Sequence, residues 1–172
     1  MDHQTFAQIL GNYGEFFGAI AVVATLAYLA AQVRHNTTAQ QANSQHIVSE
    51  GFNRANLLLV QDRELLNVMR RGNEGFSALN EEEAIVFLNY TVAFLRIYEE
   101  AYADHLRGVL EEEYWKSREG NLKAYVAMPG FQQFWTAPAP GPFMRNSSET
   151  FRPDFVELLA GLMREGRTRA AE

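Results

Sequence analysis

The hydrophobic pattern of this chain changes abruptly at Arg34. From Phe16 to Ala31 the sequence contains no charged residue and a single threonine, and the next two residues extend this run up to the arginine. Sixteen helical residues rise about 24 Å, and the two added residues bring the length to about 27 Å, close to the roughly 30 Å of hydrocarbon in a bilayer. The run over 16–33 therefore predicts a transmembrane helix.

Two other interpretations of this run remain open. A secretory signal peptide also has a short apolar region, but it begins with positive charges. The residues before Phe16 include Asp2 and Glu15 and no lysine or arginine. An alanine-rich run of this length also occurs in helices that are buried in the core of a soluble bundle. Length and flanks together favour the membrane span.

After Arg34 the apolar residues recur at steps of three and four, which is the period of amphipathic helices. The pattern predicts a helix that begins at Thr37 or Thr38 and runs straight out of the apolar run. Helices are expected over residues 37–59, 63–71, 80–108, 110–128 and 153–164, with a brief helix or turn at 131–135. No run alternates in the manner of a β-strand. The expected fold is all-α, with a single N-terminal transmembrane helix followed by a small helical bundle.

Local signals predict several helix boundaries. Asp62 is a candidate N-cap for the second helix, and Gly72 is expected to end that helix. Asn80 and Glu83 have the spacing of a capping box at the start of the longest bundle helix. The apolar stripe of this helix consists of Ala84, Phe87, Leu88, Thr91, Leu95, Tyr98, Tyr102 and Leu106. Alternating prolines exclude a helix at 137–142, which predicts a surface connection.

The predicted organisation has four parts: a short N-terminal segment (1–15), the transmembrane helix (16–33), a helical soluble domain (34–166) and a C-terminal tail (167–172). The soluble part is long enough for one self-sufficient core. A net charge of −6 provides no basic surface, so no nucleic acid is expected as a partner. Cysteine is absent, so disulfides give no indication of the compartment.

The orientation of the predicted span depends on Arg34. It directly follows the apolar run, and no lysine or arginine precedes the run. Basic residues near the end of a span favour the cytoplasmic side of the membrane. The sequence therefore predicts a single-pass protein whose C-terminal domain faces the cytoplasm.

Five segments carry a resemblance to known proteins. In chain order they are TLAYLAAQVRHNT, QDRELLNVMRRG, IYEEAYADHLRGVLEEEYW, MPGFQQFW and FRPDFVELL. Together they resemble a widespread type of uncharacterised small bacterial membrane protein, with one N-terminal transmembrane helix and a helical C-terminal domain. The resemblance implies an anchored helical domain in the bacterial inner (cytoplasmic) membrane with no known activity, and it transfers no catalytic residue.

Candidate chemistry is confined to one end of the longest bundle helix. Glu100 and Asp104 are one turn apart and His105 follows, so these three are the candidate metal ligands, with Glu99 beside them. The Glu-x-x-His spacing of di-metal bundles is absent, and the pattern favours a solvated helix face whose acids pair with nearby arginines. No catalytic residue and no cofactor are expected, because no nucleophile motif, phosphate loop or dinucleotide fingerprint occurs.

A second feature lies on the predicted transmembrane helix itself. One side carries small residues at steps of three and four, with hydroxyl and amide groups among them. Small residues allow close approach of helices in lipid, although glycine and alanine are also simply common in membrane spans. This predicted contact face consists of Gly14, Gly18, Ala21, Thr25, Tyr28 and Gln32. The expected partners are the lipid bilayer and another transmembrane helix, from a second copy or a larger membrane complex.

Two classes of function follow. The favoured hypothesis is a membrane-anchored protein with no catalytic site, which acts as an interaction or accessory subunit in a membrane complex or homo-oligomer. The alternative is a small helical domain that binds a ligand or metal, with or without enzymatic activity, through the acidic and aromatic residues around 98–105. Aromatic residues at helical spacing more often form a packed core. A pocket lined by converging acids would favour the alternative.

Overall fold

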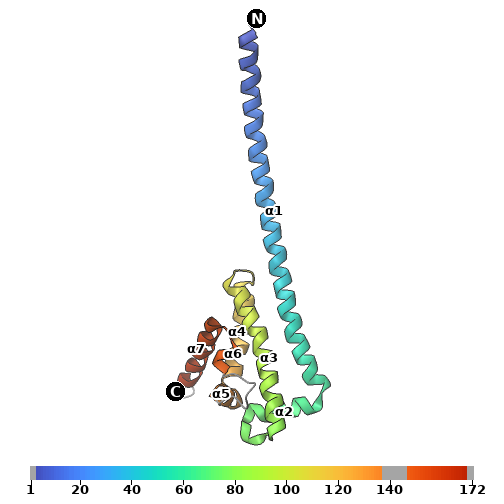
Figure 1. Cartoon of the computed structure of the whole chain (residues 1–172), viewed down its shortest axis with the longest axis vertical. Helices are drawn as coiled ribbons and strands as arrows, with labels where there is room; N and C mark the ends of the chain where they lie inside the picture. The colour runs from blue at the N-terminus through green and yellow to red at the C-terminus, as the bar shows by residue number, and fades with distance from the viewer. Residues whose placement is uncertain (1–2, 137–146, 170–172) are drawn as a thin grey trace. The chain divides into compact units, whose positions relative to one another are not determined.

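The computed structural model describes residues 3–136 and 147–169; the predicted connection over 137–142 lies outside these ranges. Every element in the described residues is helical, which confirms the all-α prediction. Residues 1–42 form one compact unit and residues 43–172 a second. The elements, labelled in Figure 1, are α1 (His3–Gln61), α2 (Arg63–Glu74), η1 (Phe76–Ala78), α3 (Glu81–Leu106), α4 (Glu112–Val126), α5 (Pro129–Thr136), α6 (Ser147–Thr150) and α7 (Pro153–Arg169).

Helix α1 joins the predicted apolar run and the predicted amphipathic helix without a break. Among the described helices, α1 alone is long and apolar enough to cross a membrane. Its most apolar window of 18 residues has a mean hydropathy of 1.5, and none of that window is buried. The side chains from Phe17 to Gln40 are all exposed. From Ser44 onward, α1 contributes buried residues to the second unit.

Helix α2 begins as predicted and ends differently. The Asp62 carboxylate accepts two backbone N–H groups of the first turn, at 2.9 and 3.0 Å, which confirms the N-cap. Gly72 does not end the helix, which continues to Glu74 and is closed by Gly75 at a φ of +150°. A Cβ atom on Gly72 would lie 2.2 Å from Cδ2 of Phe87. Gly72 therefore permits close packing against α3, and Gly75 supplies a positive-φ backbone conformation that residues with a side chain rarely adopt.

Helix α3 carries the predicted capping box. The Asn80 side chain accepts the Glu83 N–H at 2.9 Å, and the Glu83 carboxylate accepts the Asn80 N–H at 3.0 Å. The predicted stripe is buried or half-buried except at Leu106, which is 53% exposed, so that part of the prediction was wrong. The chain turns at Gly108, where φ is +70°, and Leu110 occupies the core instead at 3% exposure.

Helices α4 and α5 correspond to the predicted helix over 110–128 and to the predicted brief helix or turn at 131–135. Helix α5 packs against α2 through backbone: a Cβ on Gly130 would lie 1.8 Å from the carbonyl oxygen of Gly72. This contact holds Phe131 and Phe134 in the core, where both are buried as predicted. Pro129 is the first residue of α5, a position where its missing N–H costs no hydrogen bond.

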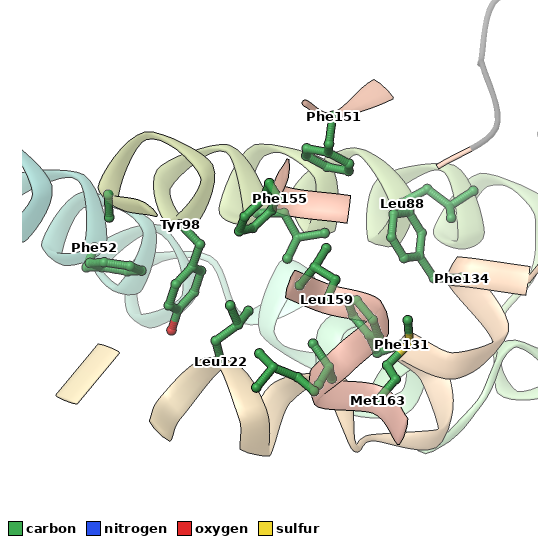
Figure 2. Packing of buried hydrophobic residues seen from close by; sticks show 14 of the residues in the cluster. Phe52, Leu88, Tyr98, Leu122, Phe131, Phe134, Phe151, Phe155, Leu159 and Met163 are labelled. Atoms are coloured by element: carbon green, nitrogen blue, oxygen red, sulfur yellow. The ribbon is translucent and has the colours of Figure 1, made fainter. Parts of the chain in front are cut away.

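The core of the second unit lies between α3, α4, α5 and α7 and is extended by the last part of α1. Phe155 and Leu159 of α7 are fully buried, and Figure 2 shows Leu159 beside Phe131 of α5. At the other end of the core, the rings of Phe52 and Tyr98 meet edge to face with centroids 4.7 Å apart. Edge-to-face pairs of this kind add specific packing to simple burial. Helix α7 extends beyond the predicted end at 164.

Candidate functional site

Glu99 is the one acid of the predicted cluster that the fold buries. Only 3% of its side chain is exposed, so its assignment to a solvated helix face was wrong. The carboxylate accepts a hydrogen bond from Arg96 Nη1 at 2.5 Å and another from the backbone N–H of Arg152 at 2.6 Å. A buried carboxylate needs partners of this kind because burial removes its hydration. Glu99 therefore connects α3 to the segment between α6 and α7.

Arg96 completes this connection from the solvent side. It donates to the carbonyl oxygen of Thr150 at 2.6 Å, and its guanidinium lies 5.0 Å from the ring centroid of Phe151. The same side chain therefore pairs with Glu99 and holds the chain that enters α7. This set of contacts is structural: both carboxylate oxygens of Glu99 and both terminal nitrogens of Arg96 are engaged by groups of the protein.

The three candidate metal ligands have separate surroundings. Asp104 accepts hydrogen bonds from Ser44 of α1 and from Arg107, the latter at 2.5 Å. The His105 ring stacks on Trp115, with centroids 5.5 Å apart and planes 15° from parallel. Glu100 is exposed. Among the described residues, no three histidine, aspartate or glutamate side chains are placed to hold a metal ion together.

The aromatic residues that were considered as a pocket lining pack on one another. Phe94 contacts Phe52, Tyr98 and Tyr125 edge to face, with centroid distances between 5.3 and 5.8 Å. Burial raises the pKa of Tyr98 and of Tyr125 to about 12. The phenol of Tyr125 shares a hydrogen bond with Thr91 at 3.1 Å. These rings fill the core and support the simpler interpretation.

A hollow of about 290 Å³ lies between the first turns of α2 and α3. Its acidic lining includes Asp62 and Glu83, and both are already engaged, Asp62 as the cap of α2 and Glu83 in the capping box of α3. Glu83 also pairs with Arg71, and this hydrogen bond holds the pKa of the Glu83 carboxyl below its usual value. The hollow therefore reflects how two helices begin side by side.

The contact face of α1 is open along its whole length. Ala21, Thr25, Tyr28 and Gln32 are exposed, and a Cβ on Gly14 or Gly18 would meet nothing within 4 Å. The Thr25 hydroxyl donates to the carbonyl oxygen of Ala21 at 2.8 Å, so its hydrogen is used inside the helix. The first unit thus presents an uncharged helical surface that no part of that unit covers.

One cluster had no signal in the sequence. The Arg118 guanidinium lies 4.9 Å from the ring centroids of both Phe52 and Tyr114, and it donates to the Tyr114 hydroxyl at 3.1 Å. Ser49 shares a hydrogen bond with the same hydroxyl at 2.6 Å. These residues join α1 to α4 across 60 or more positions of sequence, and periodicity within one helix does not predict such pairs.

Comparison of the chain with protein-family models, with curated protein sequences and with solved structures gave no match. The resemblance to small bacterial membrane proteins therefore stays a prediction. Function has to be inferred from the fold and from the surfaces of the described residues.

Proposed function

We propose that this chain is a membrane-anchored interaction protein. Residues 16–33 of α1 cross the lipid bilayer, and the helical bundle is held at the membrane surface as an accessory subunit of a membrane complex or homo-oligomer. The membrane is the inner membrane of a bacterium, as the resemblance implies. The bundle lies on the cytoplasmic side, because Arg34 follows the span and no basic residue precedes it.

The exposure of α1 is the observation that carries this proposal. Its large apolar side chains from Phe17 to Val33 are each 48% exposed or more: Phe17, Ile20, Val22, Val23, Leu26, Tyr28, Leu29 and Val33. At 100° per residue these side chains surround the helix except on the contact face, which carries small and uncharged polar residues instead. A helix with apolar residues on most sides and no charged side needs lipid or a surrounding protein core. The first unit offers no such core.

The energetics favour lipid. Eight residues over 16–33 are Leu, Ile, Phe or Val. Each contributes about 0.3 to 0.6 kcal/mol to membrane insertion near the centre of a helix, so together they favour insertion by roughly 2 to 5 kcal/mol. No charged residue opposes this until Arg34, at the edge of the run. The backbone needs no partner in lipid, because a helix satisfies its own N–H and C=O groups.

A role in binding is supported by the use of the polar groups in the bundle. Glu99, Asp104 and Glu83, all on α3, are each engaged by a basic residue, and each links α3 to another segment of the bundle. The aromatic residues fill a core. The contact face of α1 is the surface whose composition fits association inside a membrane.

Alkaline carbonate extraction tests the membrane anchor. Wild-type protein is expected to stay with washed membranes. Leu26→Asp places a charge near the middle of the run at a cost of about 3 kcal/mol, on the order of the whole insertion energy, and is expected in the supernatant. Leu26→Ala is the matched control and should remain in the pellet. Release of the wild-type chain by carbonate would contradict the anchor.

A separate experiment tests the orientation of the span. An alkaline phosphatase fused to the C-terminus should be inactive, because the proposed orientation places the C-terminus in the cytoplasm.

A further inference from the structure

The open side of α1 continues past the proposed span at the same spacing. From Gly14 to Gln32 the contact face steps by four and three residues, which is the heptad spacing of left-handed helix pairs. At that spacing it next meets His35, Ala39, Ala42 and His46, and all these side chains are exposed. We call these a and d positions, from Gly14 to His46, the seam. It is about 48 Å long.

Charge along α1 indicates what kind of surface the seam can meet. Between Glu15 and Glu50 the only residue among Asp, Glu, Lys and Arg is Arg34. In the heptad Arg34 takes position c, outside the seam. A second copy of the chain would therefore bring no Asp, Glu, Lys or Arg against its own counterpart along the seam, and like charges of that kind are the usual obstacle to pairing of identical surfaces. A partner of opposite charge has nothing on the seam to recognise.

The polar groups of the seam suit an identical partner. Tyr28 and Gln32 each carry both a hydrogen-bond donor and an acceptor, so each can pair with its own counterpart across a two-fold axis. Thr25 gives its hydrogen to the Ala21 carbonyl and keeps its lone pairs for a donor on another helix. Hydrogen bonds between spans of this kind contribute about 1 kcal/mol each.

A second and independent observation comes from residues 35–40, which follow the proposed span. None of them is Asp, Glu, Lys or Arg, and all are exposed. Lipid does not explain a helix here, and a single polar helix without charge pairs is marginal in water. Thr37 and Thr38 donate back to helix carbonyls at 3.0 and 3.1 Å, which weakens a helix further. A partner helix would supply the missing support.

The bundle's contacts with the last part of α1 lie off the seam at Ser44 and end it at Ser49. Ser44, which bonds Asp104 of α3, takes position f, on the opposite side of the helix from a and d. The next d position after His46 is Ser49, and its hydroxyl is already bonded to Tyr114 of α4 at 2.6 Å. Pairing through the seam therefore stops at the turn where the bundle begins to use the same side of α1.

We propose that the partner of α1 is a second copy of this chain, paired in parallel along the seam. Parallel pairing follows because identical chains insert in the same orientation. This inference rests on the proposed function, since it assumes that the two copies share one membrane. It names the partner that the proposed function leaves open.

Disulfide mapping on washed membranes tests the proposed pair. The chain has no native cysteine, so every disulfide between two copies forms at the introduced position. Single-cysteine versions of the full chain are oxidised in the membrane. Ala39→Cys and Ala42→Cys lie on the seam, and Thr37→Cys and Gln40→Cys are the matched controls at positions f and b. A disulfide forms only when the two Cα atoms come within about 7 Å, so seam positions should give at least about tenfold more dimer than the controls.

A product of twice the chain mass at positions 39 and 42 supports the proposal. It is overturned by monomer at every position, by equal yields at all four, or by a product whose mass reveals a different protein. Gly18→Leu in the Ala39→Cys chain should lower the dimer yield severalfold, because leucine separates the helices. Loss of the chain from washed membranes would contradict the membrane anchor, whereas its presence there without seam-specific dimers would contradict the pairing alone.

Discussion

Substituting Gly130 with alanine tests the packing of α5 on α2. The added Cβ would lie 1.8 Å from the carbonyl oxygen of Gly72 and 2.9 Å from Cα of Asn73. Ordinary contacts between such atoms begin near 3.5 Å, so the two helices must separate by more than 1 Å. Both obstructing atoms belong to backbone and have no rotamer to change. We therefore expect a destabilisation at the upper end of the range for overpacking, about 3 kcal/mol.

Urea unfolding of the full chain in mild detergent measures this change. Trp115 and Trp135 both lie in the second unit, so their fluorescence reports on the bundle and not on the proposed span. With an m-value of roughly 2 kcal/mol/M, a loss of about 3 kcal/mol lowers the midpoint by about 1.5 M. Gly120→Ala is the control: it lies in α4 with nothing within 4 Å of the new Cβ. It should stabilise the bundle by about 0.5 to 1 kcal/mol through helix propensity.

Equal midpoints for the two variants would refute the reasoning, because the only relevant difference between them is the space around the new methyl group. An unchanged midpoint for Gly130→Ala with a changed m-value would also contradict it, since that pattern reports a change in the compactness of one state and not a packing clash.

Three further predictions concern the seam, the buried acid and the buried phenols. Gly18→Leu should leave the chain in washed membranes while lowering its self-association by co-purification of two tagged copies, and Leu26→Ala, outside the seam, should do neither. Glu99→Ala should cost about 2 kcal/mol in urea unfolding, because it removes the acceptor of two hydrogen bonds, and Glu99→Gln should cost less because its amide oxygen still accepts one; equal costs would contradict this. Burial raises the pKa of Tyr98 and Tyr125 from 10.0 to about 12, so the contribution of these neutral phenols to the free energy of unfolding is fully present below pH 10 and is lost as the pH rises toward 12. Tyr98→Phe should therefore make the free energy of unfolding fall less steeply with pH in this range. An unchanged slope would show that the phenol of Tyr98 is not the cause.

Features that depend on a few neighbouring residues were predictable from the sequence. The cap at Asp62 and the capping box of Asn80 and Glu83 form as expected, because each needs only backbone groups within three residues. The apolar stripe of α3 was predictable for the same reason, since it follows from helical periodicity. Its failure at Leu106 occurs at the last turn, where the position of Leu110 decides which side chain is covered.

Features that depend on contacts between distant segments were not predictable. Glycine is a residue type that commonly ends helices, but the role of Gly72 is set by its close contacts with Phe87 and Gly130, which lie 15 and 58 positions away. Glu99 is three residues from Arg96, a spacing that is typical of a surface ion pair. Its burial depends on a distant group: the Arg152 N–H, 53 positions later, donates a hydrogen bond to the second carboxylate oxygen. Spacing within one helix contains no information on either contact.

The candidate functional residues show the same difference between features of a single helix and contacts between helices. The contact face was visible in the sequence because it is a periodic feature of one helix, and the structure leaves it exposed. Glu100, Asp104 and His105 are neighbours in sequence, yet in the structure Asp104 accepts a hydrogen bond from Ser44 and the His105 ring stacks on Trp115. Convergence of side chains from several helices decides whether acids form a site, and only the fold supplies it.

Cysteine accessibility along α1 tests the central claim, that residues 16–33 lie inside a bilayer. Ala24→Cys falls in the middle of the run and Thr38→Cys a few residues beyond it, in a chain with no other cysteine. In inside-out membrane vesicles a membrane-impermeant maleimide should label Thr38→Cys at once and should label Ala24→Cys only after the membrane is dissolved and the chain denatured. Equal labelling of the two cysteines in intact vesicles would show that α1 does not cross the membrane there.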